Sequence, residues 1–235
     1  MSALEDLVRA GKIRYIGVSD TPAWKIVEAN MTAHLRGWAP FIGLQIEYSL
    51  LERSVEQELV PMALQFGLGI TPWSPLKSGA LSGKYTRATA GQVKADRGFL
   101  ESFINDKTFA VVDALEAIAQ AHDSTVARMA LAWVQAQPGV SSTIIGARRL
   151  TQLEDNVQAI DVRLTAEELD RLHRTHEAHV RLPAEHAADV SRHTQWRNDG
   201  KRCIRADYRL WDPEGRSAVL TANVDLDQPS HQRPL

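Results

Sequence analysis

Short apolar segments alternate with amphipathic helical patterns along this chain, and that alternation restricts the fold more than any other feature. Four apolar segments are rich in β-branched or aromatic residues and precede turn-forming residues, as buried parallel strands do: residues 13–18, 41–47, 67–73 and 142–145. Helical patterns cover residues 22–36, 54–66, 107–121, 125–137, 150–160 and 166–176. This order predicts an α/β fold in which helices cover a parallel sheet.

The spacing of the strands leaves two architectures open. The first three begin about 25 to 30 residues apart, which suits the units of a TIM (β/α)8 barrel, although a doubly wound sheet has the same local order. Four strands are half of the eight that such a barrel needs. Residues 2–11 resemble the end of a helix whose earlier part would precede Met1. We therefore expect either part of a barrel or an open doubly wound sheet.

Three of the predicted helices carry capping residues at their starts. Thr21 is expected to cap the first helix, and Asp123 or Ser124 the fourth. Thr165 and Glu168 have the spacing of a capping box at the start of the last helix. These positions define where the helices should begin.

Composition argues against several classes of partner. The chain has 235 residues, a formal net charge of −2 and no basic stripe, so we do not expect it to bind nucleic acid. Its apolar runs are all shorter than the roughly 20 residues that span a bilayer, so no membrane partner is expected. The single cysteine, Cys203, rules out an internal disulfide, and no secretory signal pattern is found. Both observations predict a cytoplasmic protein with an inert thiol.

The last part of the chain differs from the rest. Beyond residue 179 the helical periodicity fades, and residues 180–235 are rich in Arg, Asp and His and poor in aliphatic side chains. We expect residues 1–179 to form the α/β domain and residues 180–235 to be a weakly ordered C-terminal extension. A short hairpin at residues 209–225 is the alternative there, because Asp-Pro-Glu-Gly at residues 212–215 is a good turn sequence.

Histidines gather near the end of the predicted domain, where five of the eight lie between His173 and His193. His176 and His179 are three residues apart and would share one face of a helix. No cysteine or carboxylate completes a convincing set of metal ligands with them. We therefore expect a solvated helix end and no metal site.

Polar and aromatic residues lie at the end of each predicted strand. They are Ser19 and Asp20, Gln45 and Tyr48, Trp73 and Ser74, and Gly146 and Arg148. In a parallel α/β protein the strand ends meet at one edge of the sheet, where ligands bind. Hydroxyl, amide, indole and guanidinium groups together suit a large polar ligand with an aromatic part, such as a dinucleotide. Each of these residues taken singly could instead cap a helix or belong to the core.

Four motifs of the chain resemble those of the aldo-keto reductases. They lie at residues 9–19, 45–53, 73–85 and 145–156, and they resemble the family's segments at the fifth, sixth, seventh and eighth barrel strands, in that order. One such motif would be modest support, whereas four in order within residues 3–172 are hard to obtain by chance. The resemblance implies an α/β fold that is a partial TIM (β/α)8 barrel, made of strands 5–8 with their helices.

The resemblance assigns the nicotinamide end of a cofactor to three of the strand ends. Ser19 and Gln45 would hydrogen-bond the carboxamide, and Trp73 would offer a flat apolar platform with an N–H donor. Asp20 stands where the family often has asparagine, and a carboxylate lacks the donors of an amide. The motif at residues 73–85 would follow the pyrophosphate with backbone N–H groups, and Lys84 would add charge to it.

The eighth-strand motif would bind the adenosine end. Arg148 and Gln152 would lie near a ribose 2′-phosphate, which a guanidinium matches well, and Asp155 and Asn156 would contact the adenine amine. The arginine favours NADPH over NADH, although it could also be a solvated surface residue. The full set of residues that we expect to bind NADP(H) is Ser19, Asp20, Gln45, Trp73, Ser74, Pro75, Leu76, Ser78, Gly79, Lys84, Gly146, Arg148, Gln152, Asp155 and Asn156.

The resemblance does not supply catalytic residues. Members of the family reduce carbonyl groups to alcohols by hydride transfer, with a tyrosine as proton donor assisted by a lysine, an aspartate and usually a histidine. Those residues belong to the first four strands, which would precede Met1. Tyr15 and Tyr48 lie in other motifs, so we assign neither of them this role.

Three functions stay open at this point. The first is an NADPH-dependent oxidoreductase of aldo-keto reductase type, present as a fragment, whose partners would be a small carbonyl substrate and either a complementing chain or a second copy. The second is a non-catalytic NADPH-binding, regulatory or interaction module, and the third is a remnant without function. Because unpaired strand edges and uncovered inward apolar residues reduce stability, we expect the chain alone to be marginally stable, oligomeric or aggregation-prone.

Overall fold

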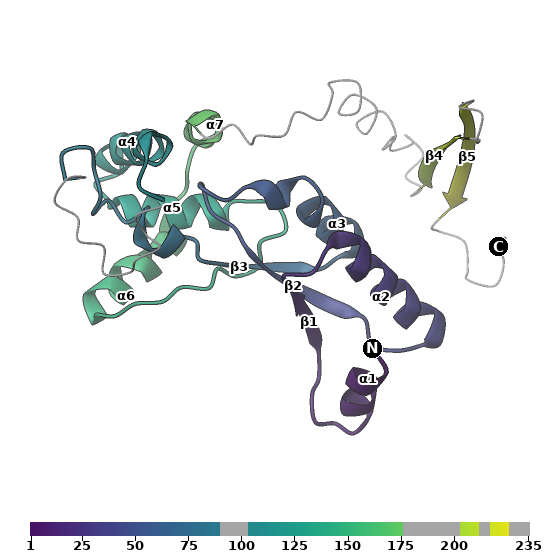
Figure 1. The fold of residues 1–235 in the computed structure, drawn as a ribbon. Coiled ribbons are helices and arrows are strands. Elements are labelled where there is room, and N and C mark those ends of the chain that lie inside the picture. Colours follow the sequence, from purple (N-terminus) through teal and green to yellow (C-terminus); the bar gives the residue numbers. More distant parts are fainter. Residues whose placement is uncertain (90–102, 176–202, 212–216, 226–235) are drawn as a thin grey trace. The chain divides into compact units, whose positions relative to one another are not determined.

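The computed structural model describes residues 1–89, 103–175, 203–211 and 217–225. The chain divides into two compact units, Met1–His179 and Val180–Leu235 (Figure 1). In the described residues, the first unit contains a parallel sheet with α-helices, and the second contains a pair of antiparallel strands.

Three parallel strands form the sheet of the first unit, in the order β1-β2-β3 (Figure 1). They are β1 (Ile16–Ser19), β2 (Phe41–Glu47) and β3 (Gly69–Trp73). α2 (Ala23–Arg36) connects β1 to β2, and the 3-10 helix η1 (Ser54–Glu56) with α3 (Leu59–Phe66) connects β2 to β3. The predicted alternation of strands and helices is confirmed. Within the described residues, the sheet does not close into a barrel.

The two faces of the sheet differ in what covers them. One face carries apolar side chains that are each at most 6% exposed, namely Ile16, Leu44, Ile46 and Ile70. The last three join residues of α2 and α3 in the main hydrophobic core. The other face, called the open face below, consists of residues that are all partly or fully exposed: Gly17, Ser19, Gly43, Gln45, Glu47, Gly69, Thr71 and Trp73. Glycine and polar residues dominate it. The expectation that large inward apolar residues would be left uncovered is therefore wrong for this face.

The predicted fourth strand, residues 142–145, is extended beside β3 without forming a regular ladder. Ile70 donates its N–H to the carbonyl of Gly139 (2.8 Å) and accepts from Ser141 N–H (2.9 Å). The next bond, from Ile144 N–H to the carbonyl of Pro72 (2.8 Å), comes one residue later than regular pairing would place it. Pro72 has no N–H to donate, so the ladder loses a rung at this point and the pairing becomes irregular.

The remaining helices lie close to the positions expected from the sequence, except that the 3-10 helix η2 was not predicted. They are α1 (Ser2–Arg9), the 3-10 helix η2 (Lys77–Gly79), α4 (Asp106–Ala121), α5 (Val126–Gln135), α6 (Leu150–Val157), the 3-10 helix η5 (Gln158–Asp161) and α7 (Ala166–Thr175). α4 contacts α5 and α7, and α5 contacts α6 and η5. Leu115 of α4, Met129 of α5 and Leu172 of α7 are fully buried and belong to the same core as the sheet.

Two of the three expected helix caps differ from the prediction. The hydroxyl of Thr21 donates to the carbonyl of Ser19 (2.9 Å) and does not cap α2. α5 is capped by Thr125, whose hydroxyl accepts from Arg128 N–H (3.2 Å), and not by Asp123 or Ser124. The capping box before α7 is confirmed, because Glu168 N–H donates to the Thr165 hydroxyl (3.2 Å) and Thr165 N–H donates to the Glu168 carboxylate (2.7 Å).

Proline explains why the predicted helix at residues 54–66 is broken. The structure has a single 3-10 turn at η1, and α3 begins only at Leu59. A proline ring clashes with the carbonyl four residues earlier in a continuous α-helix, and Pro61 would meet the carbonyl of Gln57 in this way. A helix that begins at residue 54 therefore cannot continue through Pro61, whereas α3 begins at Leu59 and holds Pro61 in its first turn.

The second unit contains an antiparallel pair of strands, β4 (Cys203–Trp211) and β5 (Ser217–Asp225). Trp211 lies opposite Ser217, so the predicted hairpin is confirmed and its first strand begins earlier than expected. The turn residues 212–216 lie outside the described residues. None of the helices that the structure describes is long and apolar enough to cross a membrane.

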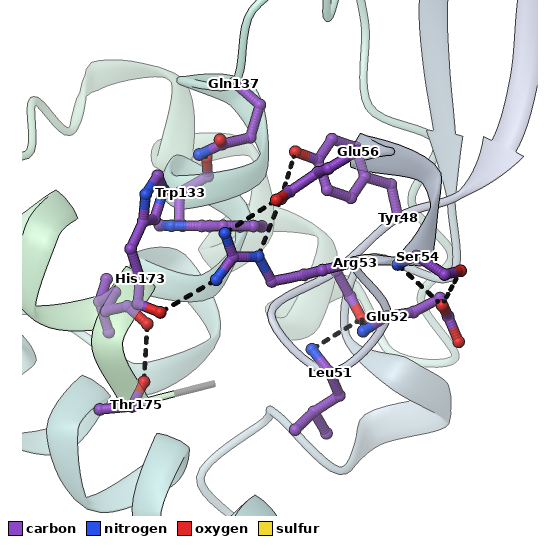
Figure 2. Close-up of polar contacts among 12 residues, drawn as sticks. Tyr48, Leu51, Glu52, Arg53, Ser54, Glu56, Trp133, Gln137, His173 and Thr175 are labelled. Carbon is purple, nitrogen blue, oxygen red and sulfur yellow. Dashed lines mark hydrogen bonds and ion pairs between the residues drawn. The ribbon is translucent and has the colours of Figure 1, made fainter. Parts of the chain in front are cut away.

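A cluster around Arg53 joins the sheet to the helices of the first unit (Figure 2). The guanidinium donates to both carboxylate oxygens of Glu56, at 2.8 Å each, and to the backbone carbonyl of His173 in α7 at 3.0 Å. Tyr48, at the end of β2, donates its hydroxyl to the same Glu56 (2.8 Å). The Trp133 ring of α5 lies against all of these groups, 5.6 Å from the Arg53 guanidinium and 5.7 Å from the Tyr48 ring.

Replacing Arg53 by methionine should destabilise the first unit strongly. The change leaves the partly buried carboxylate of Glu56 without its bidentate partner, and removing one member of a buried ion pair typically costs about 3 kcal/mol or more. The free energy of unfolding, measured with urea, should fall by about this amount. Arg174→Met on α7 is the control, because the side chain of Arg174 is 74% exposed and its ion pair should contribute less than about 1 kcal/mol. Equal effects of the two changes would contradict this account.

His173 should make the stability of the fold depend on pH. Burial, with the nearby charge of Arg53, lowers the pKa of His173 below its ordinary 6.5, while Glu56 and Asp170 act in the opposite direction. Its Nε2 atom is buried and has no hydrogen-bond partner among the described residues. The unfolded chain thus takes up a proton before the folded chain does, so the stabilisation is complete above pH 6.5 and is lost as the pH falls through the folded pKa.

The test compares urea midpoints at about pH 7.5 and about pH 5.5, where carboxylates stay ionised. The wild type should lose stability at the lower pH, and His173→Gln should lose less. His34→Gln, at an exposed position of α2, should behave as the wild type does. A wild-type pH dependence that survives in His173→Gln would assign the effect to another group.

Candidate functional site

A cavity of about 610 Å³ lies between the segment that follows β3 and the segment that begins α6. One side, called the turn wall below, is formed by Pro75, Leu76, Ser78, Gly79, Ser82, Lys84 and Tyr85. The other side, called the helix wall, is formed by Ile145, Gly146, Ala147, Arg148, Gln152, Asp155 and Asn156, and Ala127 of α5 also lines the cavity. Both walls follow extended segments of the sheet region, as ligand sites of parallel α/β proteins do.

The turn wall has an unusual backbone. Ser74, Lys77 and Ser78 have φ angles of +54°, +44° and +56°, in the left-handed region that residues other than glycine seldom adopt. Gly79, at +99°, continues this run. Bonds from Lys77 N–H to the Ser74 carbonyl (2.8 Å) and from Gly79 N–H to the Leu76 carbonyl (2.9 Å) hold the turn. Such strain persists only where surrounding contacts enforce it, and it is concentrated at binding sites.

The helix wall is held by polar contacts with α5. The carboxylate of Asp155 accepts from Arg128 Nε at 2.7 Å and from the Thr125 hydroxyl at 2.8 Å. Arg148 N–H donates to the Gln152 side-chain oxygen (3.1 Å), which closes the loop in front of α6. The charge of Asp155 is thereby matched by Arg128.

Positive charge is concentrated at one end of the cavity. Lys84 of the turn wall and Arg148 of the helix wall are both exposed there. They also line an adjoining cavity of about 380 Å³ together with Arg149 and Gln152. Guanidinium and ammonium groups converging in this way suit phosphate oxygens, for which arginine offers parallel donors. The donor set therefore fits a ligand that carries phosphate groups.

The structure brings together ten of the fifteen residues expected to bind the cofactor. The cavity is lined by Pro75, Leu76, Ser78, Gly79, Lys84, Gly146, Arg148, Gln152, Asp155 and Asn156. The other five, Ser19, Asp20, Gln45, Trp73 and Ser74, do not line it. Of these five, Ser74 is expected at the pyrophosphate and does not line the cavity, whereas the other four are expected at the nicotinamide end.

The five remaining residues lie at the carboxyl ends of the strands. Ser19 is opposite Gln45 in the register of the sheet, and Trp73 is opposite Glu47, so their side chains share the open face. Asp20 and Ser74 follow directly after β1 and β3 with φ angles of +46° and +54°. The side chains therefore occupy neighbouring rows of one sheet edge.

Five lining residues were not predicted: Ser82, Tyr85, Ala127, Ile145 and Ala147. All but Ala127 fall inside the motifs at residues 73–85 and 145–156, so the motifs themselves were the signal for them. Ala127 reaches the cavity from α5, and no sequence pattern connects it with the other residues.

A buried ion cluster behind the turn wall was also missed. The ammonium of Lys77, which is 6% exposed, lies 2.8 Å from the Glu47 carboxylate and 3.4 Å from that of Glu52. Burial tends to raise the pKa of Glu52, but its hydrogen bond with the Ser54 hydroxyl and the charge of Lys77 outweigh burial and lower the pKa below its ordinary 4.5. Glu47 and Lys77 are 30 residues apart, so no local sequence pattern predicts the contact.

Neither of the tyrosines that the sequence left without a catalytic role is placed as a proton donor. Tyr48 is 1% exposed, and its hydroxyl donates to Glu56. Burial and the neighbouring Glu56 carboxylate raise its pKa well above the ordinary 10. Tyr15 is 74% exposed and precedes β1. Among the described residues, no group of three His, Cys, Asp or Glu side chains could hold a metal ion.

Known proteins similar to this chain were found along its N-terminal part. The model of the Aldo/keto reductase family matches residues 1–177. The oxidoreductase YrpG of Bacillus subtilis is 37% identical over 170 residues, which cover 72% of this chain and 51% of that protein. The probable aryl-alcohol dehydrogenase AAD4 of Saccharomyces cerevisiae is 32% identical over 177 residues, which cover 73% of this chain and 53% of that protein.

A rice protein is similar to the same degree. The probable voltage-gated potassium channel subunit beta of Oryza sativa is 37% identical over 187 residues, covering 72% of this chain and 56% of that protein. The chain spans about half the length of the curated relatives it matches. The family model covers most of the chain, and the cavity collects residues from two of the four motifs that resemble this family. The chain belongs to the aldo/keto reductase family.

Proposed function

We propose that the first unit binds NADP(H) in the cavity between the turn wall and the helix wall, as the cofactor-binding part of an oxidoreductase. The observation that carries this proposal is the convergence of Lys84 and Arg148 on a cavity lined by ten of the residues expected at the phosphate and adenosine ends. In this proposal residues 1–179 correspond to strands 5–8 of the family's barrel, and residues 180–235 are an extension to it.

The charge at the cavity favours NADPH over NADH. A 2′-phosphate carries close to two negative charges, and Arg148, Arg149 and Lys84 line the adjoining cavity that would receive it. NADH has a hydroxyl at that position, and this uncharged group would gain little from these cations. The pyrophosphate would then follow the turn wall, and the nicotinamide would reach the row of Ser19, Gln45 and Trp73 on the open face.

The chemistry proposed is reduction of a carbonyl group to an alcohol, for which the bound cofactor would supply the hydride. Support comes from the names of relatives, which include aryl-alcohol dehydrogenases and the versiconal hemiacetal acetate reductase of Aspergillus parasiticus. This chain's residues would bind and orient the cofactor. A small carbonyl compound is the substrate in this proposal, and the proton donor would come from a complementing part of the barrel.

Exposed apolar side chains support a complementing part. Leu150, Leu153, Val157 and Ile160 are 42–69% exposed and recur at helical spacing along α6 and η5. A stripe of this kind on a helix is normally buried against another element. A complementing polypeptide or a second copy of the chain could cover it, and the expected association of the chain remains a prediction.

A second function is a non-catalytic module that binds NADPH. The specific observation in its favour is the similarity to a probable voltage-gated potassium channel subunit, together with the commitment of the Tyr48 hydroxyl to Glu56. A remnant without function is the third possibility, and it would bind no cofactor.

Titration with NADPH tests the cofactor proposal. The fluorescence of the reduced nicotinamide should change saturably when the purified chain is added. Arg148→Met should weaken NADPH binding by about tenfold or more, because charged hydrogen bonds to phosphate contribute about 1.5 to 3 kcal/mol, and should leave NADH binding nearly unchanged. Arg14→Met, at an exposed position before β1, is the control. Absence of saturable binding to the wild type would rule out the cofactor assignment.

An assay with a reactive aromatic aldehyde tests whether this chain carries a proton donor of its own. The purified chain should bind NADPH without oxidising it, because neither Tyr48 nor Tyr15 is placed to donate a proton. The absorbance of reduced nicotinamide is followed with the aldehyde present, and heat-denatured chain serves as the blank. Steady oxidation of NADPH by the chain alone would show that it contains a proton donor that we have not assigned.

A further inference from the structure

Lys77 has a different environment from its neighbours in the turn wall. Leu76 and Ser78 on either side of it line the cavity, but Lys77 does not, and its side chain is 6% exposed. A charged side chain this deeply buried must be paired to be tolerated. Lys77 must therefore pair with oppositely charged groups outside the cavity.

Its contacts lead to the end of β2 and the loop that follows. The ammonium of Lys77 lies 2.8 Å from Glu47, the last residue of β2, and 3.4 Å from Glu52. Glu52 is itself held by a reciprocal pair of backbone hydrogen bonds with Ser49. The ring of Phe103 covers the ammonium on another side, at 4.9 Å.

The same stretch contains the strained backbone. Ser74, Lys77 and Ser78 all adopt left-handed φ angles, which non-glycine residues leave when nothing holds them there. The ion pairs of Lys77 connect the middle of this stretch to Glu47 at the end of β2 and to Glu52 in the loop that follows. They are thus suited to keep the turn wall in the shape that it presents to the cavity.

We propose that Lys77 is a positioning residue that sets the affinity of the turn wall for the pyrophosphate of a dinucleotide, acting through Leu76, Ser78 and Gly79. Lys77 itself does not touch the ligand. The inference rests on the proposed binding of NADP(H) in this cavity. It predicts that ligands that contact Leu76, Ser78 and Gly79 depend on Lys77, whereas ligands that do not reach these residues are independent of it.

Two ligands distinguish the walls. NADPH would contact both, and adenosine 2′-monophosphate has no pyrophosphate. It would contact Arg148 and Gln152 of the helix wall and, of the turn wall, only Lys84. Lys77→Met removes the charge while keeping a long apolar stem, and Lys77→Arg keeps the charge. Lys25→Met is the matched control, because Lys25 makes an exposed ion pair with Glu28 on α2.

Dissociation constants are measured by calorimetry for both ligands, with each variant shown to be folded by its circular dichroism spectrum. Lys77→Met should weaken NADPH by about tenfold or more and adenosine 2′-monophosphate by less than about twofold. Lys77→Arg should recover most of the loss, and Lys25→Met should match the wild type. If Lys77→Met does not fold, Glu52→Gln takes its place, because it removes the charge of only the more distant partner. It should also weaken NADPH binding selectively, by a smaller factor.

Several results would overturn the inference. One is an unchanged NADPH dissociation constant in the folded Lys77→Met variant, or in Glu52→Gln where that variant decides. Another is an equal loss for both ligands, which would mean that Lys77 supports the fold as a whole. A wild-type chain that binds neither ligand would contradict the proposed function, and the inference with it. Failure of the function would therefore show in the wild type, whereas failure of the inference alone would show in the variants.

Discussion

The guanidinium of Arg53 is the contact on which the first unit depends most. It is reached by the end of β2 through Tyr48 and Glu56, by α5 through Trp133 and by α7 through the His173 carbonyl. Because its side chain is only 9% exposed, each of these groups has given up water to make the contact. One side chain thus fixes the helices relative to the sheet, and the position of α5 then fixes α6 through Arg128 and Asp155.

The two walls of the cavity depend on different parts of this arrangement. The helix wall follows α5, because Thr125 and Arg128 at the start of that helix hold Asp155. The turn wall follows the sheet, because Lys77 reaches back to Glu47 and Glu52. A ligand bound between the walls would therefore join elements that are otherwise connected mainly through the hydrophobic core and the Arg53 cluster.

Local sequence signals predicted the elements well and the contacts between distant residues poorly. The strand order, the capping box at Thr165 and most residues of both walls follow from patterns within a few residues or within one motif. The break before α3 follows from Pro61, and the irregular pairing near Ile144 follows from Pro72. The effect of each proline depends on the hydrogen bond that its missing N–H would have made in the folded chain. The ion pairs of Lys77 with Glu47 and of Arg128 with Asp155 join residues 27 to 30 apart, and only folding brings them together.

The composition of the open face has a consequence for any polypeptide that covers it. Glycine and polar residues offer little apolar area, so covering this face would release little water from nonpolar surface. The heat capacity change of such an association would come mainly from the stripe of Leu150, Leu153, Val157 and Ile160, and would be small for the size of the interface. Recognition at the sheet itself would then depend on hydrogen bonds and shape. An imperfect fit would weaken binding at such a polar surface more than at an apolar interface.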